Sequence, residues 1–144
     1  MEAYIRIEPD ADSGLEVETC KRGERDLVVE LSVCRAHGRS LVGPPPLELI
    51  GEVPDERVTA VGAAVLADWQ RLDYDPDLGA FMVFTTCRIW RFAEEHVHCT
   101  KQEAADWVLA RDRSVRAVDA ALHDRPLEES DVRQLMARVQ AAIT

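Results

Sequence analysis

The segment Leu78–Glu95 is apolar on most of its sides, and this limits where it can lie in a folded chain. A helix whose apolar residues fall on every face, instead of along one stripe, has to be buried. The sequence therefore predicts a central helix around which the other elements pack, and it predicts that this helix ends in the polar Glu94-Glu95-His96. The large apolar residues of the segment are Phe81, Met82, Val83, Phe84, Ile89, Trp90 and Phe92.

Amphipathic patterns on both sides of this segment predict the surrounding helices. Thr100 and Glu103 form a capping box, in which the hydroxyl and the carboxylate each accept a hydrogen bond from a backbone N–H of the first turn. Elsewhere apolar residues recur at three- and four-residue spacing, and Pro126 interrupts the pattern before the last helix. The predicted fold class is mainly α, a helical bundle of about five to six helices. Besides the central segment, the expected helices cover 27–37, 55–72, a stretch that starts at Thr100, 115–122 and 132–143.

The first residues of the chain follow a different pattern. Tyr4–Ile7 precede the turn-forming Pro9–Gly14, and alternating apolar and polar residues follow, which is typical of a short β-hairpin. Asp10 and Asp12 resemble a metal-binding carboxylate pair, but the phosphate-binding turn that such a pair needs does not precede them. We interpret both as the tip of the hairpin.

These patterns predict that the chain has two structural parts. Residues 1–25 are expected to form a short β segment, and residues 26–144 are expected to form a helical domain. Within the helical domain, Gly43–Pro46 cannot continue a helix or a central strand, so this run predicts a rigid extended crossing.

The acidic balance of the chain excludes several classes of partner. Among 144 residues there are 17 Lys and Arg against 27 Asp and Glu, a net charge of −10, and such a surface repels nucleic-acid backbones.

No stretch approaches the roughly 18 consecutive apolar residues of a membrane span, and the N-terminus has no apolar core of a secretory signal. We therefore expect a cytoplasmic protein whose four cysteines form no disulfides.

Two clusters contain side chains that bind metals in other proteins. Asp73–Asp77 begins like a calcium loop, but Leu78 and Phe84 stand where that loop requires glycine and glutamate. The segment His96-Val97-His98-Cys99 offers three zinc ligands, yet a structural zinc site needs a fourth ligand from a second cluster. We interpret both as solvated connections and predict no metal site.

Three blocks of sequence go beyond what helical patterning explains. They are Asp26–Pro54, with its Leu41-Val42-Gly43-Pro44-Pro45 run; Val83–Trp90; and Thr100–Arg111, which contains Lys-x-x-Ala-Ala-x-Trp. Over roughly residues 26–125, these blocks resemble the C-terminal helical domain of the aminoglycoside nucleotidyltransferases, in particular the streptomycin/spectinomycin 3″-adenylyltransferase family. Enzymes of this bacterial antibiotic-resistance family bind ATP and the antibiotic in a cleft between this domain and an N-terminal nucleotidyltransferase lobe.

The resemblance implies roles for individual residues. Trp90 is expected to stack on the antibiotic, with packing in the core as the alternative, and Glu94 or Glu95 is expected to pair with ammonium groups of the antibiotic. Lys101 and Arg111 are expected to face the nucleotide phosphates.

The family's first lobe carries a Gly-Ser turn and an Asp-x-Asp pair for magnesium, and residues 1–25 match at most its last strands. Glu2 is the candidate for the family's catalytic base, because the strand that follows it matches the strand that bears this base. The leading hypothesis is therefore a substrate-binding helical domain that does not transfer adenylate by itself. On this hypothesis the chain has no cofactor of its own, and Mg and ATP act only if a catalytic lobe is supplied.

Two alternatives remain open at this point. One is a truncated form of a complete aminoglycoside nucleotidyltransferase, and the other is a helical binding or dimerisation module without catalysis. The expected ligand is a cationic small molecule such as an aminoglycoside. We also expect a homodimer, because a domain that evolved against a missing lobe exposes an apolar patch that self-association can cover.

Overall fold

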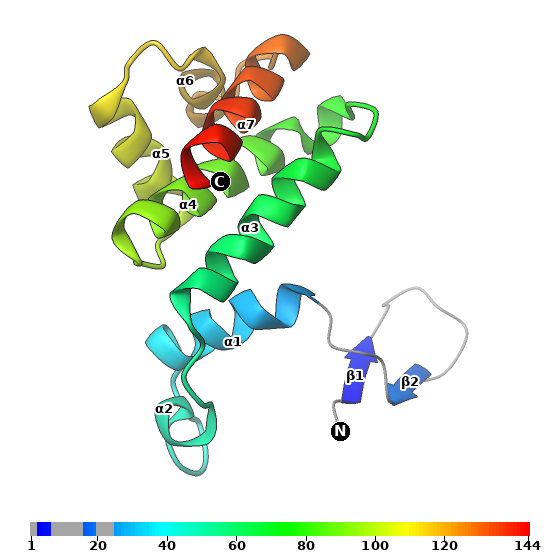
Figure 1. The fold of residues 1–144 in the computed structure, drawn as a ribbon, viewed down its shortest axis with the longest axis vertical. Helices are drawn as coiled ribbons and strands as arrows, with labels where there is room; N and C mark the ends of the chain where they lie inside the picture. The colour runs from blue at the N-terminus through cyan, green and yellow to red at the C-terminus, as the bar shows by residue number, and fades with distance from the viewer. Residues whose placement is uncertain (1–2, 7–15, 20–24) are drawn as a thin grey trace.

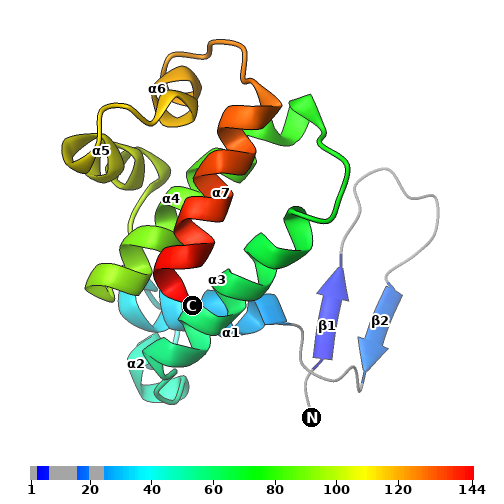
Figure 2. The same ribbon diagram turned by 45° about the horizontal axis from the view of Figure 1, so that its top comes forward.

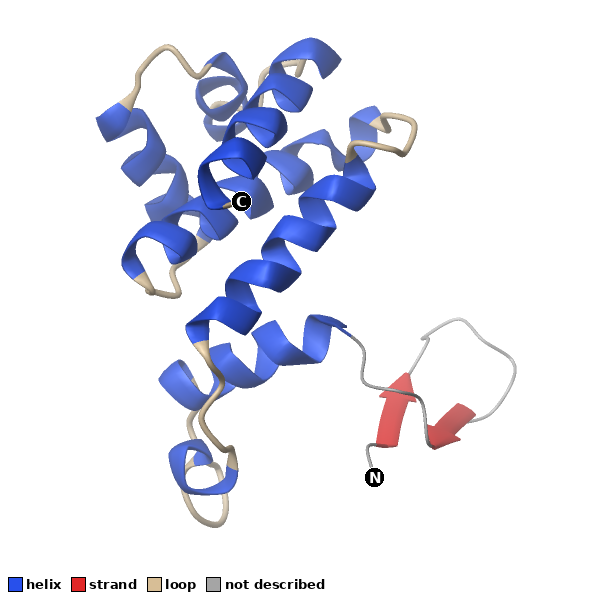
Figure 3. Cartoon of the chain, viewed as in Figure 1, coloured by secondary structure: helices blue, strands red, loops and turns tan. Residues whose placement is uncertain are grey.

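A computed structural model of the chain describes the backbone of residues 3–6 and 16–19 and all of residues 25–144 (Figure 1). Residues 25–144 form seven α-helices, coloured blue in Figure 3, so the predicted fold class, mainly α, is confirmed. None of the described helices is both long and apolar enough to cross a membrane. The elements are α1 (Arg25–His37), α2 (Pro46–Leu49), α3 (Asp55–Trp69), the 3-10 turn η1 (Pro76–Leu78), α4 (Gly79–Glu95), α5 (Lys101–Arg111), α6 (Arg116–Leu122) and α7 (Glu129–Ile143).

Two short strands precede the helices. β1 (Ala3–Arg6) and β2 (Glu16–Thr19) pair antiparallel, with Ala3 opposite Thr19 and Arg6 opposite Glu16 (Figure 2). The predicted hairpin tip at Pro9–Gly14 and the candidate base Glu2 lie outside the described residues. The hairpin and the role of Glu2 therefore stay predictions.

α4 lies at the centre of the helical domain, where it contacts α3, α5, α6 and α7. The hydroxyl of Thr86, which is fully buried, donates a hydrogen bond of 2.7 Å to the carbonyl oxygen of Met82, so this buried polar group is satisfied. The prediction of a central helix is confirmed, although Phe81 near its start is 47% exposed. The buried residues of α4 are Gly79, Met82, Val83, Thr86, Cys87, Trp90 and Phe92.

α3 approaches α4 closely at Gly62. A Cβ atom at this position would lie 2.7 Å from Cγ2 and 3.2 Å from Cγ1 of Ile89. Because isoleucine is β-branched, its χ1 angle is stiff and the side chain cannot move aside at low cost. Gly62 therefore sets how closely these two helices pack.

We expect the substitution Gly62→Ala to destabilise the protein. Helix propensity alone favours alanine by about 1 kcal/mol, whereas overpacking a core contact costs about 1–3 kcal/mol, and the stiff neighbour makes the second effect the larger. Urea denaturation should show a free energy of unfolding lowered by about 1 kcal/mol. Gly51→Ala is the control, because no atom lies within 4 Å of a Cβ built there. A Gly62→Ala variant as stable as the wild type would contradict the close approach.

The sequence prediction missed the short helix α2, which explains why the helix number exceeds the expected five to six. Gly43 has a positive φ of 89°, and the hydroxyl of Ser40 donates to the carbonyl oxygen of Pro44 at 2.6 Å, so this part of the run is a turn. Pro45 is extended as predicted, but Pro46 begins α2. Proline suits the first position of a helix, because the N–H it lacks has no intrahelical partner there.

α1 packs against α3 without burying any of its residues. Polar contacts attach it to α3 and to the connection between α4 and α5: Arg25 pairs with Asp68 at 2.7 Å, and the hydroxyl of Ser32 lies 2.7 Å from Nε2 of His98. Burial lowers the pKa of His98, and the neighbouring His37 adds to this effect. α1 is therefore held by these polar contacts together with half-buried apolar residues, Leu27, Val28 and Val29 among them.

The segment that follows α1 exposes apolar side chains. Leu41 and Val42 are 98% and 94% exposed, and Leu47 and Leu49 are also exposed. Arg35 of α1 holds this segment in place by donating to the carbonyl oxygens of Leu47 and Ile50, at 2.8 and 2.5 Å. We call Leu41, Val42, Leu47 and Leu49 the 41–49 surface.

Candidate functional site

The connection between α4 and α5 turns back along α4, so the start of α5 lies beside α4. His96 adopts a left-handed conformation with φ 55°, and the ring of His98 then lies over Phe92, with ring centroids 4.6 Å apart. The predicted capping box follows: Oγ1 of Thr100 accepts from the N–H of Glu103 at 3.2 Å, and Oε2 of Glu103 accepts from the N–H of Thr100 at 2.8 Å. This reversal determines which residues of α4 the first residue of α5 can reach.

Three helices contribute to one exposed aromatic surface. The ring of Phe81 on α4 lies 5.7 Å from the ring of Trp69, at the end of α3. The ammonium of Lys101, the first residue of α5, lies 5.9 Å from the centroid of the Phe81 ring, within the range of a cation–π contact. We call Trp69, Phe81 and Lys101 the Phe81 face.

A second cation lies on the same side of α4. Phe81, Thr85 and Arg88 are spaced by four and three residues, so they share one face of the helix. Nη2 of Arg88 donates to Oγ1 of Thr85 at 3.3 Å, while its Nε is buried and has no hydrogen-bond partner among the described residues. A buried donor without a partner is unfavourable. Arg88 therefore adds a second positive charge on the side of α4 that carries Phe81, although its Nε itself is buried.

Carboxylates adjoin the Phe81 face. Asp73, Asp75 and Asp77 are exposed on the connection between α3 and α4. This connection begins just after Trp69 and ends just before Phe81, and because those two rings are in contact, it forms a short loop beside them. The sequence analysis missed this grouping, because it tested the alternating aspartates only as a calcium loop.

The predicted antibiotic-binding residue Trp90 lies away from the Phe81 face, toward the C-terminal end of α4. It is 7% exposed, its ring meets Trp107 edge-on at 5.7 Å, and the guanidinium carbon of Arg138 lies 5.0 Å from its centroid. The core packing that the sequence analysis gave as the alternative is what the structure shows. The stacking role of Trp90 stays a prediction, and a ligand that stacked there would first have to displace Arg138.

Glu95 and Arg111, which were predicted to bind different ligands, bind each other. Nη2 of Arg111 and the indole Nε1 of Trp107 donate to Oε1 of Glu95, at 3.0 and 2.5 Å, and Nε of Arg91 donates to Oε2 at 3.2 Å. These donors, Trp107 above all, hold the pKa of Glu95 below its usual range. Glu94 is exposed and forms no ion pair within residues 25–144, and its role in antibiotic binding stays a prediction.

The two residues predicted to bind the nucleotide also lie apart. Lys101 and Arg111 are the first and last residues of α5, whose 11 residues separate them by about 15 Å along the axis. The ring of Trp107 lies 3.5 Å from the guanidinium carbon of Arg111. Arg111 thus belongs to the cluster around Glu95, and Lys101 belongs to the Phe81 face.

A family comparison decides what kind of domain this is. Residues 48–141 match the family model described as the C-terminal domain of aminoglycoside adenylyltransferase. The chain belongs to this family. The resemblance identified from the sequence is therefore confirmed, while a comparison with curated proteins finds no match. The Phe81 face and Arg88 lie inside the matched adenylyltransferase domain, whereas α1 precedes it.

The side chains considered for zinc diverge in this adenylyltransferase domain. Nδ1 of His96 lies 3.2 Å from a carboxylate oxygen of Asp55, while His98 faces Ser32 and Phe92. Within the described part of the chain, no three His, Cys, Asp or Glu side chains lie close enough together to hold a metal ion. The expectation that the chain has no metal site stays a prediction.

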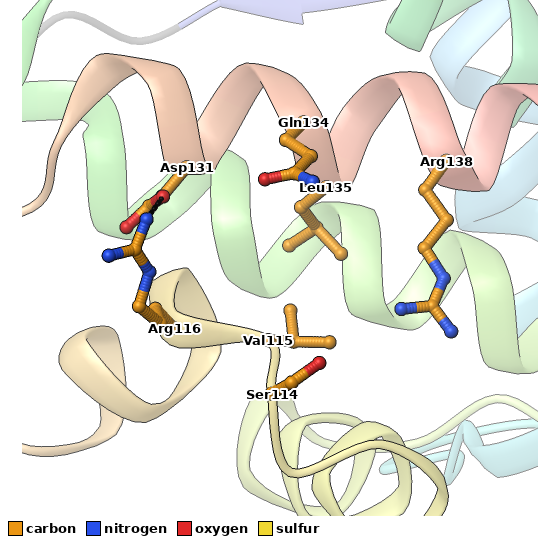
Figure 4. A pocket seen from close by; sticks show the side chains of 7 residues that line it. All are labelled: Ser114, Val115, Arg116, Asp131, Gln134, Leu135 and Arg138. Carbon is orange, nitrogen blue, oxygen red and sulfur yellow. Dashed lines mark hydrogen bonds and ion pairs between the residues drawn. The ribbon is translucent and has the colours of Figure 1, made fainter.

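The adenylyltransferase domain also has a small cavity between the connection from α5 to α6 and α7 (Figure 4). Arg116 and Asp131 face each other at its edge and form an ion pair of 2.7 Å. Its volume of about 70 Å³ is far below the roughly 300–1,000 Å³ of pockets that enclose a small-molecule ligand. This cavity is therefore too small to enclose a nucleotide or an antibiotic.

Proposed function

We propose that this chain is the substrate-binding helical domain of an aminoglycoside adenylyltransferase and that it binds the nucleotide phosphates at the Phe81 face. The observation that supports this is the position of two cations on one side of α4, with Lys101 over the Phe81 ring and Arg88 on the same helix face as Phe81. An ammonium and a guanidinium together suit the oxygens of a triphosphate. ATP is then the cofactor of this site, and a separate lobe supplies magnesium and the catalytic carboxylates.

We infer that the cationic antibiotic binds beside the phosphates, at Asp73, Asp75 and Asp77. An aminoglycoside is a polycation, so exposed carboxylates next to an aromatic ring offer it ion pairs and a cation–π contact. The loop that carries these aspartates adjoins Trp69 and Phe81. Both substrates then meet at one face, as adenylyl transfer requires.

We expect Lys101→Ala to weaken ATP binding by about two- to fivefold, because an exposed ion pair contributes about 0.2–1 kcal/mol. Binding is followed by NMR shift titration with ATP at low ionic strength, without magnesium, and millimolar affinity is expected for the wild type. Arg57→Ala is the matched control, since it removes the same charge from an exposed residue of α3 whose side chain forms no ion pair with the described residues. Equal weakening by both substitutions, or no binding by the wild type, would refute the phosphate site.

The purified chain is expected to transfer no adenylate. Nothing in the helical domain replaces the metal-held charge stabilisation that phosphoryl transfer needs. Incubation with Mg-ATP and streptomycin or spectinomycin should release no pyrophosphate above the level without antibiotic. Antibiotic-dependent release would show that this chain is a complete catalyst.

A dimerisation module is the second candidate function, and the 41–49 surface favours it. Leu41 and Val42 are almost completely exposed, and the bonds from Ser40 and Arg35 hold the segment in one conformation. Four exposed apolar side chains on a rigid segment are suited to bury against a second copy of the chain.

Sedimentation equilibrium at high micromolar concentration should show a homodimer. The double substitution Leu41→Ser/Val42→Ser should shift the equilibrium to the monomer, because it removes the most exposed apolar side chains of the 41–49 surface. Leu72→Ser, at an exposed leucine on another part of the molecule, is the control and should leave the dimer intact. A monomeric wild type would exclude this candidate function.

A further inference from the structure

α5 runs along α4 in a fixed register. Nη1 of Arg91 donates to the carbonyl oxygen of Glu103 at 3.3 Å, and Trp107 donates to Glu95; both contacts join residues twelve positions apart. Together these contacts place the first turn of α5 nearer the middle of α4 than its later turns, which lie nearer the end of α4. The start of α5 therefore lies beside the middle of α4.

The carboxylate of Glu95 makes most of the contacts that hold this register. It accepts hydrogen bonds from Trp107 and Arg111 of α5, and also from Arg91 of α4 itself. Trp107 is 8% exposed and packs against Trp90, so little water can reach its indole N–H to take the place of Glu95. One side chain in the last turn of α4 thus fixes the second and third turns of α5.

The apolar contacts of α5 do not select one register as strongly. The buried stripe of this helix consists of Ala104, Ala105, Trp107 and Val108. Except for the tryptophan these side chains are small. They form low ridges on α5, which interlock only weakly with the side chains of α4. A shift of one turn moves the whole helix by about 5.4 Å, and it would carry Lys101 away from the Phe81 ring by the same distance.

We propose that Glu95 is a positioning residue, which fixes α5 on α4 and thereby places Lys101 at the Phe81 face. The inference rests on the proposed function of that face. Glu95 lies at the opposite end of α4 from Phe81, so it acts on the ligand through the position of α5 and not by contact.

The neighbouring residue supplies a matched control. Glu94 carries the same charge at the same end of α4, but it forms no ion pair in the described part of the chain. If charge alone mattered, removing either carboxylate would strengthen the binding of anionic ATP, because both repel it. If position matters, only the loss of Glu95 changes the first turn of α5, and this loss weakens ATP binding.

The test compares Glu95→Ala, Glu95→Gln and Glu94→Ala in the full chain by NMR, with ATP as the probe. Glu95→Ala should shift the backbone amide signals of residues 100–103 and weaken ATP binding by about two- to fivefold. Glu95→Gln should retain most of the wild-type behaviour, because its amide oxygen still accepts from Trp107. Glu94→Ala should leave the amide signals of residues 100–103 in place.

A second variant keeps the test decisive if Glu95→Ala does not fold. Trp107→Phe removes the indole donor but keeps most of the ring, and it should shift the same amide signals by a smaller amount. Unshifted signals of residues 100–103 in Glu95→Ala, or in Trp107→Phe if the first variant does not fold, would overturn the proposal. Equal strengthening of ATP binding by Glu95→Ala and Glu94→Ala would overturn it as well.

The amide signals separate this inference from the proposed function. If the wild type binds no ATP but Glu95→Ala still shifts residues 100–103 and Glu94→Ala does not, the phosphate site is refuted and the role of Glu95 in placing α5 is supported. If ATP binds the wild type and the amides do not move, the phosphate site stands and the positioning role is overturned.

Discussion

The burial of α4 is the constraint on which the rest of the fold depends. A helix with apolar side chains on most faces has to be covered on most faces, and α3, α5, α6 and α7 cover it. Close packing at Gly62 brings α3 near enough for Trp69 to reach Phe81. These helices leave the start of α4 partly uncovered, where Phe81 is 47% exposed and carries the proposed site.

Most of the fold could be predicted from the sequence, because the helices carry local signals. The capping box at Thr100 and the apolar spacing of α3 and α7 predict helices in the correct places. α2 was missed because it has four residues, too few for any periodic pattern, and starts inside a proline run. The strand pattern of the first residues predicts a hairpin whose turn lies outside the described residues, so the hairpin stays a prediction.

The site was less predictable, because it depends on the direction of a five-residue connection. Helix patterns place Lys101 and Arg111 on one helix, but they do not tell which residues of α4 each one meets. The left-handed His96 turns the chain back, and this sends Lys101 to Phe81 and Arg111 to Glu95. Carboxylates and arginines that look like ligand-binding residues in the sequence can thus be partners of one another, as Glu95 and Arg111 are.

The attachment of α1 determines which conditions can release it. Detaching a helix with no buried residue exposes less apolar surface than unfolding any of the core helices. The heat-capacity change of an opening and its dependence on urea concentration both scale with the surface that it exposes. Hydrogen exchange of the α1 amides should then proceed by a local opening that urea hardly accelerates. Salt screens the exposed Arg25–Asp68 pair, and acid charges His98, whose burial disfavours the charged ring. α1 can therefore open on its own, at a lower cost than the helices that bury core residues.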